Sequence, residues 1–440
     1  MRLVHTSDWH LGHALHGVAR DHEHARFLAW LEQVLVEERP HALLITGDVF
    51  DTATPSAAAE RALFDFLARA RAADPALVII ILGGNHDSAP RLEAPASLLR
   101  ALGVHVVASL RRRPGQPLDL ERLVVPLRAG GEVAAWLAVV PFLRPADLPP
   151  AHVAQDPLAA VRAVYDEVLA HARARRAPGQ ALLATGHLTL TGAEASAESE
   201  RPVLGGLTAL TDDLFAPDLA YVALGHLHRA QAVGGREGVR YAGSPIPLSM
   251  TEAGYAHQVV VVDVEGERLA AARPRLVPRT VDLLRLPAPD EPPATVDEAL
   301  ARLCALPDDA PPAPGQPDVR PLLEVRLAAP APEPGLRRRV EEALAGKAAR
   351  LVKLTLVAPE ATTAPRALAD AAPQARLTDL SPREVFERCW SKEHQGAPPP
   401  DDVARAFDDL LAAVQRPAPE ASAPTRAVDR IAALTGGDAA

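Results

Sequence analysis

Cysteine is scarce in this 440-residue chain, which has only Cys304 and Cys389. Two thiols exclude a disulfide framework and suit a reducing compartment, so we expect a cytoplasmic protein. Long apolar runs are also missing: no stretch approaches the roughly 18 apolar residues of a membrane span. The N-terminal MRLVHTSD lacks the apolar core of a signal peptide. We therefore expect no membrane association.

Positive charge is in short supply as well. The 46 Lys and Arg residues are outnumbered by 56 Asp and Glu residues, which gives a formal net charge of −10. An acidic chain has no overall attraction for nucleic acid or anionic lipid, so any DNA binding would depend on local basic patches. Hydrophobic residues still make up 48% of the chain, enough for a sizeable core. The length indicates two or three domains.

The first 270 or so residues alternate short apolar runs with amphipathic stretches. The amphipathic stretches predict helices over 20–38, 56–72 and 157–176. Several apolar runs are uninterrupted, as in strands that are covered on both faces. This alternation predicts an α/β domain over 1–272. The expected strands are RLVH (2–5), ALLIT (42–46), ALVIIIL (76–82), AWLAVV (135–140), ALLAT (181–185), AYVAL (220–224) and QVVVVDV (258–264).

The rest of the chain is organised differently. A proline-rich break at 286–293 predicts a linker. Two helical segments within 380–416 flank the turn-rich QGAPPP, and 417–440 is expected to be a disordered tail. Between 278 and 360 the pattern predicts a small βαβαβ unit. Its expected elements are a strand near 280–285, a helix at 295–305, a strand at 322–328, a helix at 335–345 and a strand at 351–357.

Five of the apolar runs in the first domain end in Asp, Asn or His. Asp8 and His10 lie two positions apart, so in extended chain they point to the same side, and His226 and His228 repeat this spacing. In α/β sheets, ligands collect outside the carboxyl ends of the strands, so we expect the five ends to face one crevice. The candidate ligands are Asp8, His10, Asp48, Asn85, His187, His226 and His228.

These seven side chains offer oxygen and nitrogen but no thiolate. Such a set suits two divalent ions rather than a structural zinc; we expect Mn²⁺, with Fe²⁺ or Mg²⁺ as alternatives. Taken singly, His187 after a strand is more often a core histidine, and Asp48 and Asn85 are ordinary turn residues. Five strand ends with the same chemistry favour a two-metal site, the clamp used for in-line phosphoryl displacement.

The motifs SDWH, GDVFD, GGNHD, TGH and GHLH occur in this order. Together they resemble the signature of the calcineurin-like metallophosphoesterases. The longer stretches TSDWHLGH, GDVFDTATPS, GNHDS and YVALGHLHRAQ…YAGSPIPLSM are similar to the bacterial SbcD nucleases within that superfamily. The resemblance implies an α/β sandwich of two sheets flanked by helices, with 278–360 as a small capping domain and C-terminal helices.

The resemblance also implies a role for each site residue. Asp8, His10 and His228 would hold one ion, and Asp48 would bridge to a second. That second ion would be held by Asn85, His187 and His226. His86 corresponds to the catalytic histidine of the family, and Asp51 corresponds to the residue that orients it. Asp87 is interpreted as structural, holding the turn.

The activity implied is that of a metal-dependent DNA nuclease, acting as a double-strand exonuclease and a single-strand or hairpin endonuclease. Its expected partner is an SbcC-like ATPase with a coiled coil, in DNA end processing, repair and recombination. A homodimer is also expected, and the stretches 56–72 and 92–101 are candidates for its interface, although core packing explains them equally well.

Direct contacts with DNA and with the ATPase are weaker predictions. For DNA we name His13, His16 and Arg20, and the run Arg111–Arg113, although a solvated surface loop is the preferred reading of that run. A helical hairpin with apolar faces cannot bury itself well alone, so 380–416 is expected to dock on the partner, or alternatively on the capping domain. Its candidate contact residues are Phe386, Trp390, Phe407 and Leu410.

Two other functions are compatible with the fold. A phosphatase or small-molecule cyclic phosphodiesterase would share it, but the phosphatase pattern has an arginine after the second aspartate motif, where this chain has Thr52-Ala53-Thr54. A small phosphodiesterase would have little use for a capping unit. Scaffold proteins of the retromer type keep the fold without the metal ligands, and all seven are present here.

Overall fold

The computed structural model describes residues 1–110, 118–144, 147–148, 156–194, 210–309, 312–313, 315–328 and 335–357, and a few positions between 386 and 407. Residues 1–359 form one compact unit and 360–440 a second. Among the described residues, none of the helices combines the length and apolar character needed to cross a bilayer. Leu410, the run Arg111–Arg113 and the tail at 417–440 lie outside the described residues.

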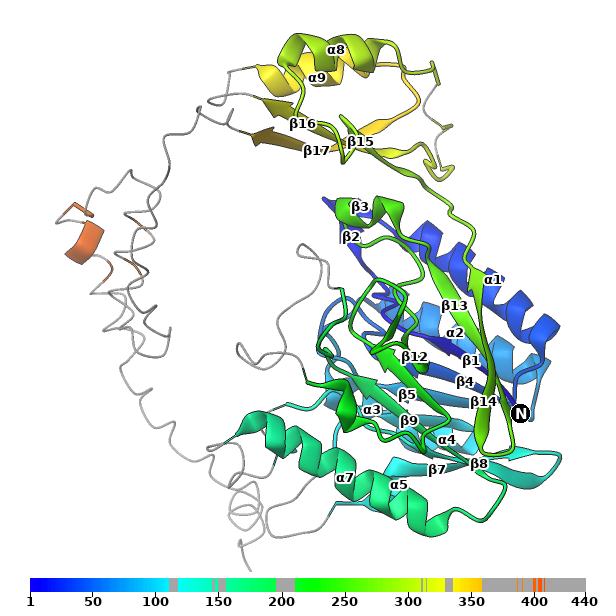
Figure 1. The fold of residues 1–440 in the computed structure, drawn as a ribbon. Coiled ribbons are helices and arrows are strands. Elements are labelled where there is room, and N and C mark those ends of the chain that lie inside the picture. Colours follow the sequence, from blue (N-terminus) through cyan, green and yellow to red (C-terminus); the bar gives the residue numbers. More distant parts are fainter. Residues whose placement is uncertain are drawn as a thin grey trace, which may run out of the picture. The chain divides into compact units, whose positions relative to one another are not determined.

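Two six-stranded sheets form the larger part of the described first unit (Figure 1). The first sheet, in spatial order, consists of β14 (Arg268–Leu276), β13 (Gln258–Glu265), β1 (Arg2–Thr6), β4 (Ala42–Thr46), β5 (Val78–Leu82) and β6 (Val104–Val107). The second consists of β11 (Gln231–Val233), β12 (Arg236–Tyr241), β10 (Tyr221–Gly225), β9 (Ala181–His187), β8 (Glu132–Ala138) and β7 (Val124–Ala129).

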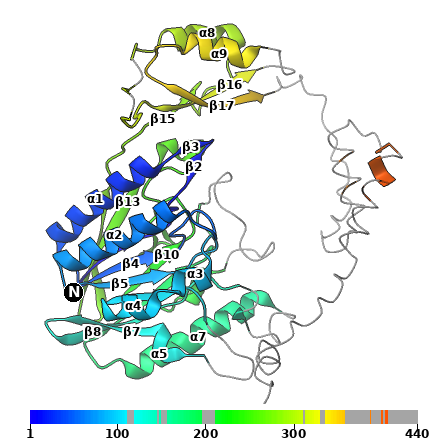
Figure 2. The same ribbon diagram turned by 180° about the vertical axis from the view of Figure 1, so that it is seen from behind.

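The strands of the first sheet are apolar on both faces because each face is covered. Leu3, Leu44 and Ile80 belong to the core shared with the second sheet. Their neighbours along the strands, such as Leu43 and Ile79, pack instead against helices on the other face. Figures 1 and 2 show this layering of helix, sheet, sheet and helix. The covering helices are α1 (Asp21–Glu38), α2 (Ala57–Ala73), α3 (Ala89–Glu93) and α4 (Ala96–Ala101) on the first sheet, and α5 (Leu120–Leu123) and α7 (Pro157–Arg175) on the second.

Parallel pairing brings the functional strand ends together. β1, β4 and β5 run parallel in the first sheet, and β8, β9 and β10 run parallel in the second. In the register of β9 and β10, His187 lies directly beside Gly225. The carboxyl ends of parallel strands share one edge of a sheet, so the loops after these strands gather at one end of the sandwich.

A smaller layer follows in the same unit. It has a three-stranded parallel sheet of β15 (Leu283–Leu286), β16 (Leu322–Ala328) and β17 (Arg350–Val357), covered by α8 (Val296–Cys304) and α9 (Leu336–Ala343). The expected βαβαβ order is therefore present. The break at 286–293 was expected to be a linker, but it is an internal loop between β15 and α8. The prolines of this segment therefore lie in a loop inside the small unit and not at the boundary of that unit.

Several elements have no counterpart among the sequence expectations. Strands β6, β7, β12 and β14 are short, half-exposed or mixed in polarity, so they lack the aliphatic runs that marked the central strands. The stretch 92–101, a candidate interface, contains the end of α3 and all of α4. The short hairpin of β2 (Ala14–Leu15) and β3 (Val18–Ala19), and the 3-10 helices η2 (Asp212–Leu214) and η3 (Met250–Gly254), were also not expected.

In the second unit, three of the four residues expected to contact a partner are described. The Phe386 and Phe407 rings are stacked with centroids 4.2 Å apart, and the Trp390 ring lies 6.1 Å from Phe386. Phe386 therefore contacts one aromatic residue of its own segment and one of the other segment.

The buried carboxylate of Glu324 in β16 supports the first testable prediction. Its side chain accepts hydrogen bonds from Arg285 Nε at 2.7 Å and Thr355 Oγ1 at 2.9 Å, and Lys353 Nζ lies 3.4 Å away. Burial opposes ionisation, but these partners outweigh it and lower the pKa of Glu324 from its usual 4.5. A carboxyl with a lowered pKa stabilises the fold above pH 4.5, and this contribution is lost as the pH falls below that value.

We expect Glu324→Gln to destabilise the three-stranded sheet at pH 7 by about 1–3 kcal/mol, because buried donors lose a charged acceptor. Hydrogen exchange of β16 amides measures this. The difference from the parent chain should be constant above pH 4.5 and shrink only as the pH is lowered below that value. The control is Glu341→Gln, which removes an exposed pair with Arg337 and should cost about 0.5 kcal/mol or less. Equal effects of the two changes at pH 7 would contradict the prediction.

Candidate active site

Four of the expected ligands lie in a backbone conformation that non-glycine residues rarely adopt. The φ angles are 53° at Asp8, 47° at His10, 48° at Asp48 and 98° at His226. Each such residue costs about 1–3 kcal/mol unless its surroundings hold it, and such residues cluster at functional sites. The chain therefore turns sharply directly after these strands, and the turns direct the four side chains towards the same site.

Hydrogen bonds between the strand ends hold these turns. The Asp8 and His10 amides donate to the carbonyls of Gly47 and Asp48, both at 3.0 Å. The His226 amide donates to the Asp8 carboxylate at 3.0 Å, which joins the second sheet to the first. Position 47 must be glycine, since φ is 98° and a Cβ there would lie 2.2 Å from His187 Nδ1.

Asp8, His10 and His228 form one cluster, with ligand atoms within 4.8 Å of one another and all three residues buried. A second contact fixes the ring of each histidine. His10 Nδ1 lies 3.3 Å from the Asp51 carboxylate, and His228 Nδ1 lies 3.0 Å from Glu252. Each Nδ1 carries a proton towards a carboxylate, so each Nε2 is left as a lone-pair donor facing the cluster.

Asp48, His187 and His226 form the second cluster, within the same 4.8 Å limit. The Asn85 side-chain oxygen belongs to it as well, at 2.9 Å from His187 Nε2 and 3.0 Å from His226 Nδ1. His187 Nδ1 donates to the Thr46 carbonyl at 2.9 Å, which leaves Nε2 for the cluster. The structure thus brings all seven expected ligands together in two groups.

The Asp48 carboxylate lies between the two groups. Its Oδ2 is 3.6 Å from His10 Nε2 and 3.4 Å from His187 Nε2. Its Oδ1 accepts the His86 amide at 2.8 Å. A Cβ at Gly84 would lie only 2.1 Å from this Oδ1, so the absence of a side chain there lets the next loop approach the carboxylate.

Burial and mutual charge shift the pKa values in the site in opposite directions. Burial raises the pKa of Asp8 to about 6 and lowers that of His10 to about 4 and that of His226 to about 3. At His187 burial also opposes the charge, but the adjacent Asp48 carboxylate outweighs it and raises the pKa to about 9. The pKa of Asp48 is held well below its usual value by the surrounding imidazoles, against the effect of burial.

The donor set fits divalent cations. His10 Nε2 is buried and has no hydrogen-bond partner among the described residues, although it faces Asp48. An imidazole nitrogen left in this state, next to carboxylate oxygens, is what a metal ligand requires. Asp8, His10 and His228 would hold one cation and Asn85, His187 and His226 the other, with Asp48 between them.

His86 lies beside the clusters without belonging to the seven. Its ring centroid is 4.7 Å from that of His10, and its Nδ1 donates to the main-chain carbonyl of Asp51 at 2.8 Å. Asp51, the residue expected to orient His86, contacts it through this carbonyl. The main chain of Asp51, not its carboxylate, orients His86, because the carboxylate is turned towards His10 and His13.

Of the three expected DNA contacts, Arg20 is wrong, and His13 and His16 stay predictions. Arg20 is completely buried; its guanidinium pairs with Glu23 and donates to the Pro247 carbonyl at 2.8 Å, so it braces the loop instead of reaching solvent. His13 uses both ring nitrogens internally, at 2.9 Å from the Asp51 carboxylate and 3.1 Å from the Leu248 carbonyl. A charge pattern cannot distinguish a buried arginine from an exposed one. His16, between β2 and β3, is exposed.

Asp87 has the structural role expected of it. It is buried, and its carboxylate accepts the amides of Val49, Phe50 and Gly84 at 2.9–3.1 Å. The loop after β5 is thereby fixed to the loop after β4.

Glu252 is a site residue that the sequence did not reveal. Its side chain is fully buried and accepts from His228 Nδ1 and from the Leu248 amide at 2.9 Å. A single glutamate in the segment SMTEAG has no ligand-like spacing, so no local signal identifies it.

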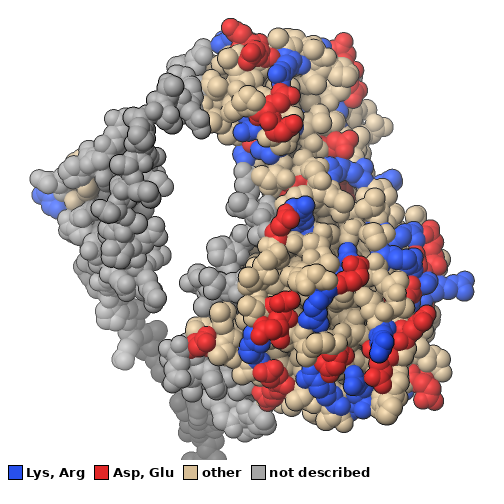
Figure 3. Space-filling view, viewed as in Figure 1, with Lys and Arg blue, Asp and Glu red and all other residues tan. Residues whose placement is uncertain are grey.

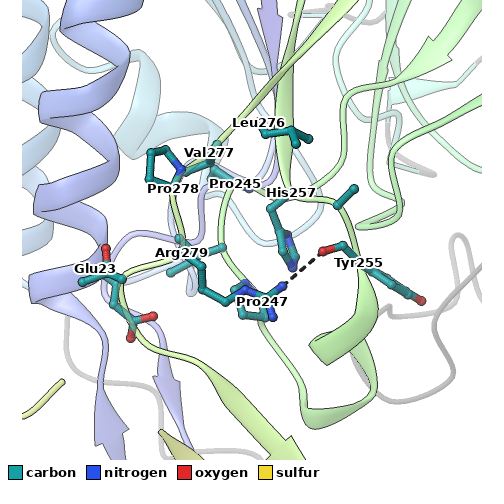
Figure 4. A pocket seen from close by; sticks show the side chains of 12 residues that line it. Glu23, Pro245, Pro247, Tyr255, His257, Leu276, Val277, Pro278 and Arg279 are labelled. Carbon is teal, nitrogen blue, oxygen red and sulfur yellow. Dashed lines mark hydrogen bonds between the residues drawn. The ribbon is translucent and has the colours of Figure 1, made fainter. Parts of the chain in front are cut away.

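The segment that carries Glu252 is held by hydrogen bonds from Arg279. Arg279 donates to the carbonyls of Ala253 at 2.6 Å and Tyr255 at 3.1 Å, beside a pocket of about 190 Å³. Figure 4 shows Arg279 reaching Tyr255 across this pocket, with the His257 ring beside it. His257 Nδ1 donates to the Ser244 carbonyl at 2.8 Å.

Comparison with known proteins gives the family. The model for calcineurin-like phosphoesterases matches residues 1–230, and the one described as the Type 5 capsule protein repressor C-terminal domain matches 279–394. The chain is 44% identical to the SbcD subunit of the SbcCD nuclease from Rhodobacter capsulatus over 397 residues, or 88% of this chain and 93% of that protein. The chain belongs to the SbcD family. The predicted fold class and enzyme class, a metal-dependent phosphodiesterase, are thereby confirmed.

More distant SbcD members also align with this chain. The SbcD subunit of the Escherichia coli SbcCD nuclease is 36% identical over 64% of this chain and 69% of its own length. The corresponding Bacillus subtilis protein is 34% identical over 60% of this chain and 66% of its own length.

The contact between His228 and Glu252 supports a prediction about metal binding. Glu252→Gln replaces a carboxylate by an amide, so the Nδ1 proton of His228 is held less firmly and the ring becomes a weaker ligand. We expect the affinity for one of two divalent cations to fall about 10- to 100-fold, measured by isothermal titration with Mn²⁺ as the probe and without DNA. Glu265→Gln, at the exposed end of β13, is the control. Unchanged binding in Glu252→Gln would show that Glu252 does not tune His228.

Proposed function

We propose that this chain is the nuclease subunit of a two-component DNA-processing complex, cleaving duplex ends and single-stranded or hairpin DNA with an SbcC-like ATPase. One observation carries the proposal: seven nitrogen and oxygen ligands converge in two clusters, the Asp48 carboxylate of one also approaches His10 of the other, and His86 lies beside them. The names of the SbcD relatives support both the nuclease activity and the partner.

The chemistry assigns different tasks to the metal ligands and to His86. Two divalent cations held by the seven ligands would polarise a phosphodiester and activate water for in-line attack. Asp48 supplies a fixed negative charge between His10 of one cluster and His187 of the other. The Nδ1–H of His86 donates a hydrogen bond to the Asp51 carbonyl, so Nε2 is the ring nitrogen left to face the substrate. In the imidazolium form Nε2 also carries a proton, with which it steadies the phosphate or protonates the leaving oxygen. Fixed charges, rather than covalent catalysis, supply most of the acceleration.

Mn²⁺ is the cation that we propose. The site offers imidazole nitrogens together with carboxylate and amide oxygens, and no sulfur. This mixture suits Mn²⁺ or Fe²⁺ better than Mg²⁺, which prefers oxygen ligands and water.

DNA binding must rest on local contacts. Acidic and basic side chains are interspersed over the face shown in Figure 3, and the chain as a whole is acidic. Phosphate contacts from exposed groups, among them His16, are proposed to hold the DNA. Binding should then weaken as salt rises.

The second unit is proposed to dock on the ATPase. The Phe386 and Phe407 rings are stacked, the Trp390 ring lies beside Phe386, and all three residues are half-buried. A partner helix laid against them would complete their burial.

Replacing His86 tests the nuclease proposal. End-labelled linear duplex DNA is incubated with Mn²⁺ and the parent chain, or with His86→Ala, each with and without the ATPase partner and ATP. We expect the parent chain to degrade the duplex and His86→Ala to be about 10²- to 10⁴-fold slower, because one proton-transferring group is lost. Mn²⁺ binding by His86→Ala should stay normal.

The outcome separates the two candidate activities. If DNA stays intact in every reaction while a cyclic nucleotide or a phosphomonoester is hydrolysed, the metal site is correct and the nuclease proposal is wrong. The chain would then be a small-molecule phosphodiesterase or phosphatase of the same fold.

A homodimer is the further assembly that we propose, through α2 and α4. Leu98 on α4 and Leu102 directly after it are 69% and 49% exposed, and Phe64 on α2 is 39% exposed. An ion pair between Arg91 and Glu60 at 3.1 Å joins α2 to α3, just before α4. Exposed apolar side chains gathered on neighbouring helices are typical of an interface.

We expect Leu98→Asp to weaken dimerisation at least about 10-fold, because it places a charge in an apolar contact. Sedimentation velocity over a range of concentrations measures the effect. Val36→Asp is the matched control, since Val36 is 59% exposed but lies on α1. A Leu98→Asp variant that dimerises like the parent would exclude this face.

A further inference from the structure

The loop at 84–87 carries Asn85 and His86 and is held on two sides. On one side Asp87 ties it to the end of β4, as described above. On the other side it meets residues 142–144, which follow β8 in the second sheet. The Phe142 amide donates to the Gly83 carbonyl at 2.9 Å, so the two segments are in direct contact where the loop begins.

Arg144 makes the second attachment. Its Nη2 donates to the Gly84 carbonyl at 3.2 Å and to the Asp87 carbonyl at 2.7 Å. These two carbonyls lie immediately before Asn85 and immediately after His86. One guanidinium nitrogen therefore bonds the chain on both sides of Asn85 and His86, the two residues that this loop contributes to the site. Arg144 itself follows a strand of the second sheet.

The guanidinium is itself held in place. It lies 5.4 Å from the centroid of the Phe142 ring, a cation–π contact. The Phe142 ring in turn meets His187 edge-on with centroids 6.1 Å apart. The Arg144 amide donates to Asp147 at 2.9 Å. Arg144 Nη1 is buried and has no hydrogen-bond partner among the described residues.

We propose that Arg144 is a positioning residue for phosphodiester cleavage, setting the loop at 84–87 and thereby the placement of Asn85 and His86. This inference rests on the proposed function. Arg144 acts through the two loop carbonyls and not by touching the substrate, because its Nη1 is buried and its Nη2 is engaged by the loop.

Lysine cannot replace arginine in this role. The planar guanidinium lies against Phe142 while one of its nitrogens bonds two carbonyls. A lysine ammonium is a compact, strongly hydrated charge on a flexible stem, so it does not keep that geometry. Displacement of a reacting group by about 1 Å can cost about 100-fold in rate.

The test compares Arg144→Ala and Arg144→Lys with the parent chain. The matched control is Arg128→Ala in β7, an exposed arginine that bonds the Gly131 carbonyl in its own hairpin turn. For both Arg144 variants we expect kcat on duplex DNA to fall about 30- to 100-fold with KM changed less than about 3-fold. Added guanidinium ion should restore part of the activity of Arg144→Ala but not that of Arg144→Lys.

Two readouts do not depend on cleavage. Hydrogen exchange of a peptide covering 84–88 reports the His86 amide, which is protected by Asp48. We expect this exchange to be at least about 10-fold faster in both variants, with β16 peptides unchanged. Mn²⁺ titration should show one of two sites weakened, because Asn85 is displaced, while the other keeps its affinity.

The outcomes separate the two proposals. If the parent chain does not cleave DNA but exchange at 84–88 and one Mn²⁺ site respond to Arg144, the nuclease proposal fails and Arg144 still positions the loop. If exchange and both Mn²⁺ affinities are unchanged, the positioning role is overturned. A rise in KM with kcat unchanged would also overturn it, because it would show that Arg144 contacts DNA. Unfolding of both variants at room temperature would likewise overturn it, since Arg144 would then be a general stability residue.

Discussion

The buried carboxylate of Asp48 is the group on which the site depends. Its Oδ2 lies between His10 and His187 of the two clusters, its Oδ1 accepts the amide of His86, and its carbonyl accepts the amide of His10. A carboxylate out of water is costly unless charge and donors surround it. The close packing of the strand ends supplies both, and the cations that the donor set fits would supply more charge.

In the histidines around Asp48, the ring nitrogen that faces away from the cluster also has a fixed hydrogen-bond partner. The Thr46 carbonyl engages His187 Nδ1, and Glu252 engages His228 Nδ1. These outer partners decide which nitrogen remains for a cation. The residues that contact the substrate or a cation are therefore held by a second set of groups behind them. Some of these groups are main-chain carbonyls and not carboxylates, as at His86.

The small three-stranded sheet is connected to this outer layer. Met250 in η3, two residues before Glu252, shares an apolar cluster with Leu15, Leu283 and Leu322. The segment that orients His228 thus packs on residues of the smaller sheet. The loop at 84–87 depends in the same way on the second large sheet through Arg144. Each half of the site is supported by an element remote in sequence.

The sequence by itself determined the α/β class, the central strands and the seven candidate ligands, because aliphatic runs and their polar ends are local patterns. It did not determine the partners of those ligands. That Arg20 is buried, that the Asp51 carboxylate turns to His10, and that Glu252 and Arg144 support the site all depend on contacts between distant segments. Tertiary structure decided them, since a side chain bonds to whatever the folded chain places beside it, and no local spacing records that neighbour.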